Sequence, residues 1–245
     1  MTSAADLREV LTGLAGFAAV QEQLLLAGAQ QAEPGDASCW AALPTVAHNT
    51  EFARQQVQRL RAIRCGQAPP EFGEADHRSA ALYAELTAQP ADSVARDSWR
   101  VSGELLEEIR SAASDDLLDA SRHPWLRGRQ LWLQVIVRGF WHPSGHLGEY
   151  YLSHGQAERA VALAEEAAAL AASLGAPDQA RGIASYNLAC ARTGAGLLDE
   201  AAAAVAEAIA FNPDVAANAA RDPDLASLRD SGMMTAVLGG CKSGL

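Results

Sequence analysis

The sequence predicts an all-α protein, an up-down four-helix bundle followed by helical hairpins. Three observations lead to this prediction. Apolar residues recur at three- and four-residue intervals over several segments of about twenty residues. Alanine-rich runs such as residues 201–210 favour helix, because alanine loses no side-chain entropy in a helix. Part of the C-terminal region also repeats itself, with Gly155 and Gly196 as equivalent positions.

The first two helices are predicted in the N-terminal quarter of the chain. Apolar residues of segment 7–24 lie on one face of a single amphipathic helix. Glycine, proline and small polar residues at 31–38 are typical of a turn. The second helix starts at Ala41 or Pro44 and ends at Ile63, where a glycine- and proline-rich stretch follows.

Two further helices complete the predicted bundle. The third covers about residues 92–113, and a loop at 122–129 separates it from a fourth helix over 129–151. Helices of this length with longer connections are typical of a four-helix bundle, which is expected over residues 1–153. Four tryptophans are expected to pack inside it: Trp99, Trp125, Trp132 and Trp141.

Residues 154–245 are predicted to form helical hairpins. Five pairs superpose at one shift: Leu147/Leu188, Gly148/Ala189, Gly155/Gly196, Ala160/Ala201 and Ala167/Ala208. Small residues let helices approach closely, and glycine suits the turn between them. The pattern resembles the tetratricopeptide repeat (TPR), with Pro213 at the family's helix-stopping position. The resemblance implies a long helix over 157–174 and a capping helix near 224–228. Since Leu147 belongs to both predicted parts, they are expected to share the fourth bundle helix.

Composition limits the partners of the protein. A formal charge of -11 and a pI of about 4.9 argue against binding to nucleic acid or to an anionic membrane. No signal-peptide pattern is found at the N-terminus, and no apolar run is expected to reach the roughly 18–20 residues of a spanning helix. The cysteines lie far apart, which indicates reduced thiols: Cys39, Cys65, Cys190 and Cys241. These observations predict a soluble cytoplasmic protein.

Histidines provide the candidate site. His142 and His146 are four residues apart on the fourth helix, close enough to bind one ion, although such a pair can also pack or be solvated. On a regular helix they share a stripe with Leu131 and Val135. His48 is the candidate third ligand; its neighbours fit either an exposed histidine or a polar cleft. The remaining histidines lie in loop-like sequence and are expected to be solvated: His77, His123 and His154.

The layout resembles the DinB/YfiT-like family of bacterial four-helix bundles over about residues 5–152. In that family a tryptophan-containing segment leads into a second helix with one histidine, and the fourth helix carries H-x-x-x-H. Here Trp40 precedes His48, and His142 and His146 supply the pair. The resemblance implies that the three histidines hold a divalent ion, either zinc, nickel, iron or manganese.

Three neighbours of these histidines bear on such a site. Glu51 and Glu149 each stand three residues from a histidine, and are either a fourth ligand, a partner of a ligand, or ordinary surface glutamates. Pro143 directly follows a ligand and removes a helical hydrogen bond to Gly139, so it either aims His142 inward or disturbs the site.

Three histidines would leave coordination positions open, as in catalytic sites. The resemblance implies metal-dependent hydrolysis of a small molecule, or transfer or isomerisation with a low-molecular-weight thiol. One alternative is a non-catalytic scaffold whose TPR-like region binds a protein partner or self-associates. Another is a self-protection protein that sequesters a small molecule.

Overall fold

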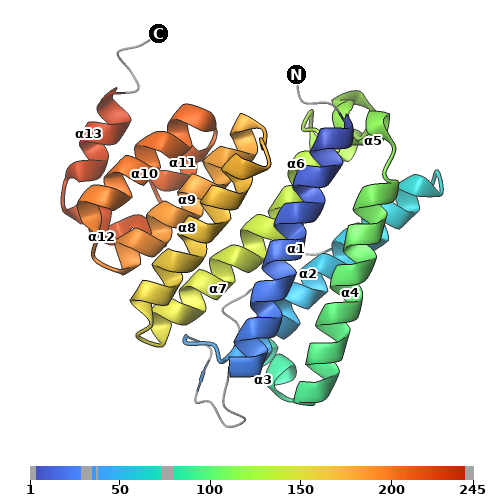
Figure 1. The fold of residues 1–245 in the computed structure, drawn as a ribbon, viewed down its shortest axis with the longest axis horizontal. Helices are drawn as coiled ribbons and strands as arrows, with labels where there is room; N and C mark the ends of the chain where they lie inside the picture. Colours follow the sequence, from blue (N-terminus) through green and yellow to red (C-terminus); the bar gives the residue numbers. More distant parts are fainter. Residues whose placement is uncertain (1–3, 29–34, 37, 73–79, 241–245) are drawn as a thin grey trace. The chain divides into compact units, whose positions relative to one another are not determined.

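The computed structural model describes residues 4–28, 35–36, 38–72 and 80–240, and every named element in these ranges is helical (Figure 1). The expected all-α class is therefore confirmed. The chain divides into two compact units, Met1–Tyr150 and Tyr151–Leu245, called unit 1 and unit 2 below. The expectations for Cys241 and His77, and for part of the turn at 31–38, lie outside the described residues.

Four long helical segments of unit 1 pack against one another. They are α1 (Ala4–Gly28), α2 (Ala42–Arg64), α4 (Ala91–Ser111) and a composite segment of α6 (Leu131–Ile136), η3 (Val137–Trp141) and α7 (His142–Ser153). Figure 1 shows these segments as the blue, cyan, green and yellow-green parts of the chain. Each predicted long helix is thus found within a few residues of its expected bounds. The division between the two units falls inside α7.

Short helices connect the long ones. They are α3 (Ala80–Thr87), α5 (Ser114–Leu118), η1 (Ala120–Arg122) and η2 (Pro124–Leu126). Neither α3 nor α5 is predicted by the apolar pattern, because short segments contain too few turns for a clear apolar period. The expected loop at 122–129 begins at the last residue of η1 and contains η2, a 3-10 turn that starts at a proline.

The core of unit 1 follows the predicted apolar faces, with exceptions. Leu11, Leu14 and Ile109 are at most 1 % exposed. At the end of α1, however, Val20 and Leu24 are exposed while Glu22 is buried. The helix therefore turns a carboxyl group toward the core at a position between two exposed apolar side chains. The tryptophans also divide, because Trp132 is buried whereas Trp99 is 60 % and Trp125 36 % exposed, so the expected packing is wrong for these two.

A buried carboxylate ties α2 to α4. Glu108 accepts hydrogen bonds from Arg61 Nε at 2.9 Å and Arg64 Nε at 3.1 Å, and its side chain is only 6 % exposed. Burial alone would raise the pKa of Glu108, but the hydrogen bonds from Arg64 and Arg61 outweigh it and hold the pKa below its ordinary value. The ion pairs therefore fix the register between the two helices.

A π-helical turn interrupts the fourth segment. Every fourth residue is buried from Leu131 through Val135, Gly139, Pro143 and Leu147, although a regular helix rotates about 40° with each such step. The five-residue π turn Val137–Trp141 compensates for this rotation, and the His142 N–H bonds to the Val137 carbonyl. The buried stripe thus passes through Pro143, one position after His142. The expectation that the histidines share the stripe of Leu131 and Val135 is wrong.

Helix α1 requires a correction to the membrane analysis. Residues Asp6–Gly28 are long and apolar enough to cross a membrane by length and composition alone. The expectation that no segment approaches this length is therefore wrong. In unit 1 the face of α1 that carries Leu7, Val10 and Leu14 is buried. A core helix meets the same criterion as a spanning one, so the finding is weak evidence for a membrane.

Unit 2 consists of successive helices. They are α8 (Ala157–Ser173), α9 (Asp178–Gly194), α10 (Leu198–Phe211), α11 (Val215–Ala219), η4 (Pro223–Leu225), α12 (Ala226–Asp230) and α13 (Met233–Gly240). Contacts join α8 to α9 and α9 to α10. Gly155 and Gly196 have φ of 71° and 78°, a left-handed conformation that favours glycine, and each precedes a helix as expected.

Small residues line the helix contacts of unit 2. The four expected alanines are at most 2 % exposed: Ala160, Ala167, Ala201 and Ala208. Gly182 of α9 approaches α10 so closely that an added Cβ would lie 2.5 Å from the Asn212 Cβ. By contrast, a Cβ at Gly148 would meet nothing within 4 Å. The expected capping helix near 224–228 is found as η4 and α12.

Candidate metal centre

The structure brings the three predicted histidines together. His48 lies on α2, and His142 and His146 lie on successive turns of α7. Their candidate ligand atoms are all within 4.8 Å of one another. The ring centroids are 5.1 Å apart for His48 and His142, 5.0 Å for His48 and His146, and 4.5 Å for the α7 pair. Two helices far apart in the sequence thus direct three imidazoles toward one point.

His48 is buried, and the exposed alternative is wrong. Its side chain is 3 % exposed and is surrounded by aromatic rings. The Trp40 ring meets it edge-on at a centroid distance of 5.3 Å, and the Phe52 ring lies 4.8 Å away. These contacts restrict the His48 rotamer. Packing therefore already supplies part of the conformational entropy cost of fixing this side chain for metal binding.

A stack of side chains supports the second histidine. The Phe52 ring stacks on the His142 ring at 3.9 Å with an interplanar angle of 16°. The Arg138 guanidinium lies over the Phe52 ring, 4.5 Å from its centroid. Arg138 belongs to the π turn, and His142 directly follows that turn. The irregular turn therefore positions both side chains. Of the two alternatives for Pro143, the convergence of His142 with the other histidines matches the one in which His142 points inward.

Glu149 acts on the third histidine, whereas Glu51 does not. The Glu149 Oε2 atom lies 3.2 Å from His146 Nδ1, which orients the ring and leaves Nε2 as the candidate ligand atom. The side chain of Glu51 is 51 % exposed and pairs with Arg54 at 3.0 Å. The structure thus supports a partner role for Glu149 and matches the surface-glutamate alternative for Glu51.

The donor set fits a divalent transition metal. Imidazole nitrogens suit zinc, nickel and iron, whereas manganese shares with calcium a preference for oxygen ligands and fits this donor set less well. A tetrahedral ion with nitrogen ligands at about 2.1 Å would separate them by roughly 3.4 Å. The observed limit of 4.8 Å therefore needs only small side-chain rotations to close. A three-histidine set also leaves a coordination position for another ligand.

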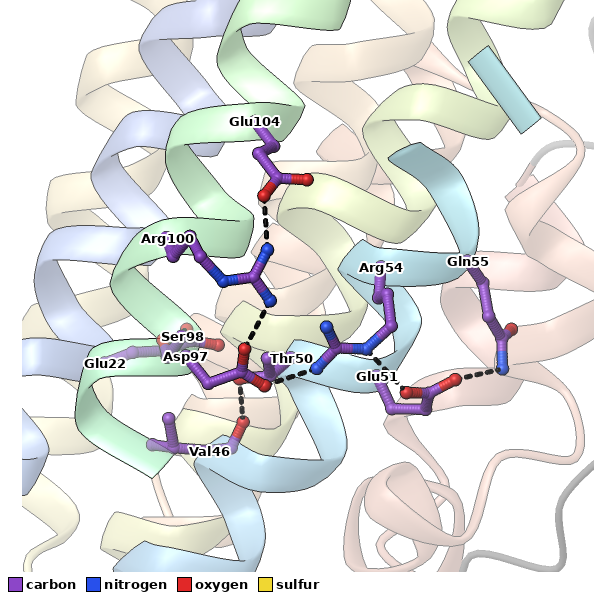
Figure 2. A network of polar contacts seen from close by, with 10 residues as sticks. All are labelled: Glu22, Val46, Thr50, Glu51, Arg54, Gln55, Asp97, Ser98, Arg100 and Glu104. Atoms are coloured by element: carbon purple, nitrogen blue, oxygen red, sulfur yellow. Dashed lines mark hydrogen bonds and ion pairs between the residues drawn. The ribbon is translucent and has the colours of Figure 1, made fainter. Parts of the chain in front are cut away.

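A pocket opens beside the cluster, between α2, α3 and α4. It has a volume of about 190 Å³, and its lining includes His48, Phe52, Leu86, Val94, Arg54 and Asp97. Figure 2 shows the polar network along this region. Arg54 pairs with Asp97 and Glu51, and Asp97 accepts from Arg100 at 2.5 Å. The network holds charged side chains of α2 and α4 in the wall of the pocket that also includes His48.

Sequence reasoning missed a buried polar group near the centre. Glu22 is 5 % exposed, and Ser98 donates to its Oε2 at 3.1 Å (Figure 2). Burial raises the pKa of Glu22 to about 7, against smaller opposing effects from Ser98 and Asn49. Glu22 lines a cavity of about 20 Å³ together with Asn49 and Pro143, which adjoin metal-ligand candidates in the chain. Spacing offered a signal, because Glu22 continues the buried series that includes Ala18.

The other histidines differ from expectation where they are described. His123 is 5 % exposed, and its Nε2 lies 2.9 Å from the Asp116 carbonyl oxygen, so the prediction that it is solvated is wrong. His154 is half-buried, with its Nδ1 3.3 Å from Ser153 Oγ. Neither belongs to the three-histidine cluster.

Comparison with known proteins adds no relative to this geometry. No family model, curated protein or solved structure matches the chain. The side chains of the cluster and the pocket beside it are therefore the observations that bear on function.

Proposed function

We propose that the protein binds one divalent metal ion through His48, His142 and His146 and uses it to act on a small molecule. The reaction is either a hydrolysis, or a transfer or isomerisation with a low-molecular-weight thiol. The convergence of three histidines from two separate helices supports this proposal. The pocket of about 190 Å³ beside His48 supports a small substrate rather than a polymer.

The surrounding residues have separable roles in this proposal. When bound, the ion would polarise a coordinated oxygen or hold a thiolate at its open position. Glu149 holds the His146 ring in one orientation, and Phe52 packs beside both His48 and His142 and excludes water from that side. Arg54, held by Asp97 and Glu51, offers hydrogen-bond donors to a polar substrate at the pocket.

We also propose the finer architecture that the sequence predicted. Residues 1–153 form a DinB/YfiT-like bundle, which the packing of α1, α2, α4 and the α6–α7 segment supports. Residues 154–245 form TPR-like hairpins, which the left-handed Gly155 and Gly196 and the buried alanines of α8 and α10 support.

Metal analysis of the purified full-length chain tests the function. After incubation with zinc, nickel, iron or manganese and removal of excess ion, we expect about one equivalent per chain. His48→Ala and His146→Ala are expected to lose it, whereas His154→Ala is the matched control and keeps it. A wild-type chain that retains no stoichiometric ion would overturn the proposal. An activity that survives both substitutions would overturn its catalytic part.

A scaffold is the second candidate, and the stacked hairpins of unit 2 favour it. Helical hairpins of this kind present extended surfaces to protein partners or to a second copy. A pull-down that recovers the same partner with wild type, H48A and H146A supports the scaffold. A small molecule recovered unchanged after long incubation with the metal-loaded chain supports sequestration instead of turnover.

A further inference from the structure

Arg59 of α2 is a buried cation in an aromatic setting. Its residue exposure is 7 %. The guanidinium carbon lies 4.7 Å from the centroid of the Phe72 ring and 5.8 Å from that of the Trp125 ring. Aromatic faces stabilise a cation, but they do not satisfy its N–H donors.

Among the described residues, Arg59 has no anionic partner. Its Nη1 atom is buried and makes no hydrogen bond. Burial lowers the pKa of Arg59 to about 10, and the positive charge of Arg138 adds to the effect. An unpaired buried charge is strongly unfavourable, and a guanidinium offers a planar pair of donors suited to a carboxylate or phosphate. The missing component is therefore an anion.

A pocket with room for such an anion adjoins Arg59. It has a volume of about 390 Å³, within the range of small-molecule pockets. Five of its seven lining residues are apolar or aromatic: Ala68, Pro69, Pro70, Phe72 and Trp125. Glu71, the acidic residue of the lining, is exposed and makes no ion pair with Arg59.

We propose that this pocket binds a small anion that carries an apolar or aromatic body. The acidic group, a carboxylate or a phosphate, pairs with Arg59, and the body lies between Phe72, Trp125 and the proline wall. The site is separate from the histidine cluster, and its occupation does not require a metal.

Binding is measured on the full-length chain after chelator treatment, so that no metal competes for the probe. The probes are benzoate and phenyl phosphate, with benzamide as the neutral control. The readout is the indole N–H signal of Trp125 in NMR spectra, assigned with a Trp125→Phe variant. A saturable shift with benzoate or phenyl phosphate, and none with benzamide at equal concentration, is the expected result. Equal responses to benzamide, or to inorganic phosphate alone, would overturn the proposal.

Substitutions of Arg59 test whether its guanidinium is the cation that binds the probe. Arg59→Gln is expected to weaken benzoate binding at least tenfold, and Arg59→Lys less, because lysine keeps the charge but not the planar pair of donors. Arg96→Gln removes an exposed arginine of α4 and is expected to change nothing. Unchanged binding by R59Q would overturn the proposal. Should R59Q fail to fold, Ala68→Trp decides, because it fills the pocket from an exposed wall position; a retained response would overturn the proposal.

The chain's own acids are tested as competitors. Glu74 and Asp76 follow the pocket residues in the sequence and lie outside the described residues. Benzoate is expected to bind the wild type and an E74Q/D76N variant with similar Kd. If benzoate binds only the double variant, Glu74 or Asp76 occupies the site in the wild type. That result would overturn the proposal of an external ligand.

Discussion

Replacing Glu22 with glutamine tests whether the core of unit 1 contains a carboxyl group that is protonated near neutral pH. Glu22 is 5 % exposed and accepts one hydrogen bond from Ser98. Burial raises its pKa from 4.5 to about 7. Between these two values the folded state binds a proton that the unfolded state releases. The stability that this group contributes is therefore complete below about pH 4.5 and is lost as the pH rises through 7.

The magnitude follows from the size of the shift. A rise from 4.5 to about 7 is about 2.5 pKa units, which at 1.36 kcal/mol per unit corresponds to roughly 3 kcal/mol. Glutamine keeps the shape and the hydrogen-bonding capacity but does not ionise. We therefore expect the wild type to lose roughly 2–3 kcal/mol more than E22Q between pH 5 and pH 8.

Urea unfolding followed by circular dichroism measures this difference. Both proteins are compared at pH 5 and pH 8 without metal, so that the titration of the histidines contributes equally and cancels. Glu9→Gln, which removes an exposed carboxylate of the same helix, is the control and is expected to behave like wild type. Equal losses of unfolding free energy in wild type and E22Q would refute the reasoning, because Glu22 would then be charged or hydrated in the folded protein.

Three further predictions concern separate parts of the chain. Glu149→Ala is expected to weaken metal affinity about tenfold, because it removes the acceptor that orients His146; competition with a chromogenic chelator measures it. Glu108→Gln is expected to cost about 1 kcal/mol at pH 7, since its arginine partners are 46 % and 51 % exposed and solvent screens the pairs. This contribution should be present above pH 4.5 and disappear as the pH falls through the lowered pKa of Glu108, which urea titrations at several pH values detect. Gly182→Ala is expected to destabilise the chain by about 1–3 kcal/mol, because the added Cβ clashes with Asn212. Gly148→Ala, where a Cβ meets open space, is expected to stabilise the chain by about 0.5–1 kcal/mol. Equal melting temperatures for the two variants would contradict the assigned packing.

Local sequence was sufficient for the long helices and for the turns of unit 2. Apolar residues at helical spacing located α1, α2 and α4, because burial of one helix face repeats along the chain. The glycines at 155 and 196 were identifiable since a left-handed turn residue is nearly always glycine. The same reasoning failed for Trp99 and His123, whose burial depends on residues distant in sequence.

The candidate site was only partly accessible from sequence. The four-residue spacing of His142 and His146 indicated a pair, and the family resemblance, not the helix pattern, selected His48. The pattern around His48 by itself favoured an exposed histidine, because a polar cleft and a solvated face have the same composition. Glu22 and Arg59 escaped notice, because charged side chains are mostly exposed. The spacing of Glu22 from Ala18 was the one signal that it faces the core.

By itself, the sequence determined that this chain is helical, where its long helices run and which two histidines share a face, because these properties depend on neighbours within a few turns. Only the tertiary structure decided that the His48 ring meets the other two and that a π turn precedes His142. It also decided that Glu22 and Arg59 are buried. Each of these outcomes depends on the packing of segments dozens of residues apart, which local spacing by itself does not determine.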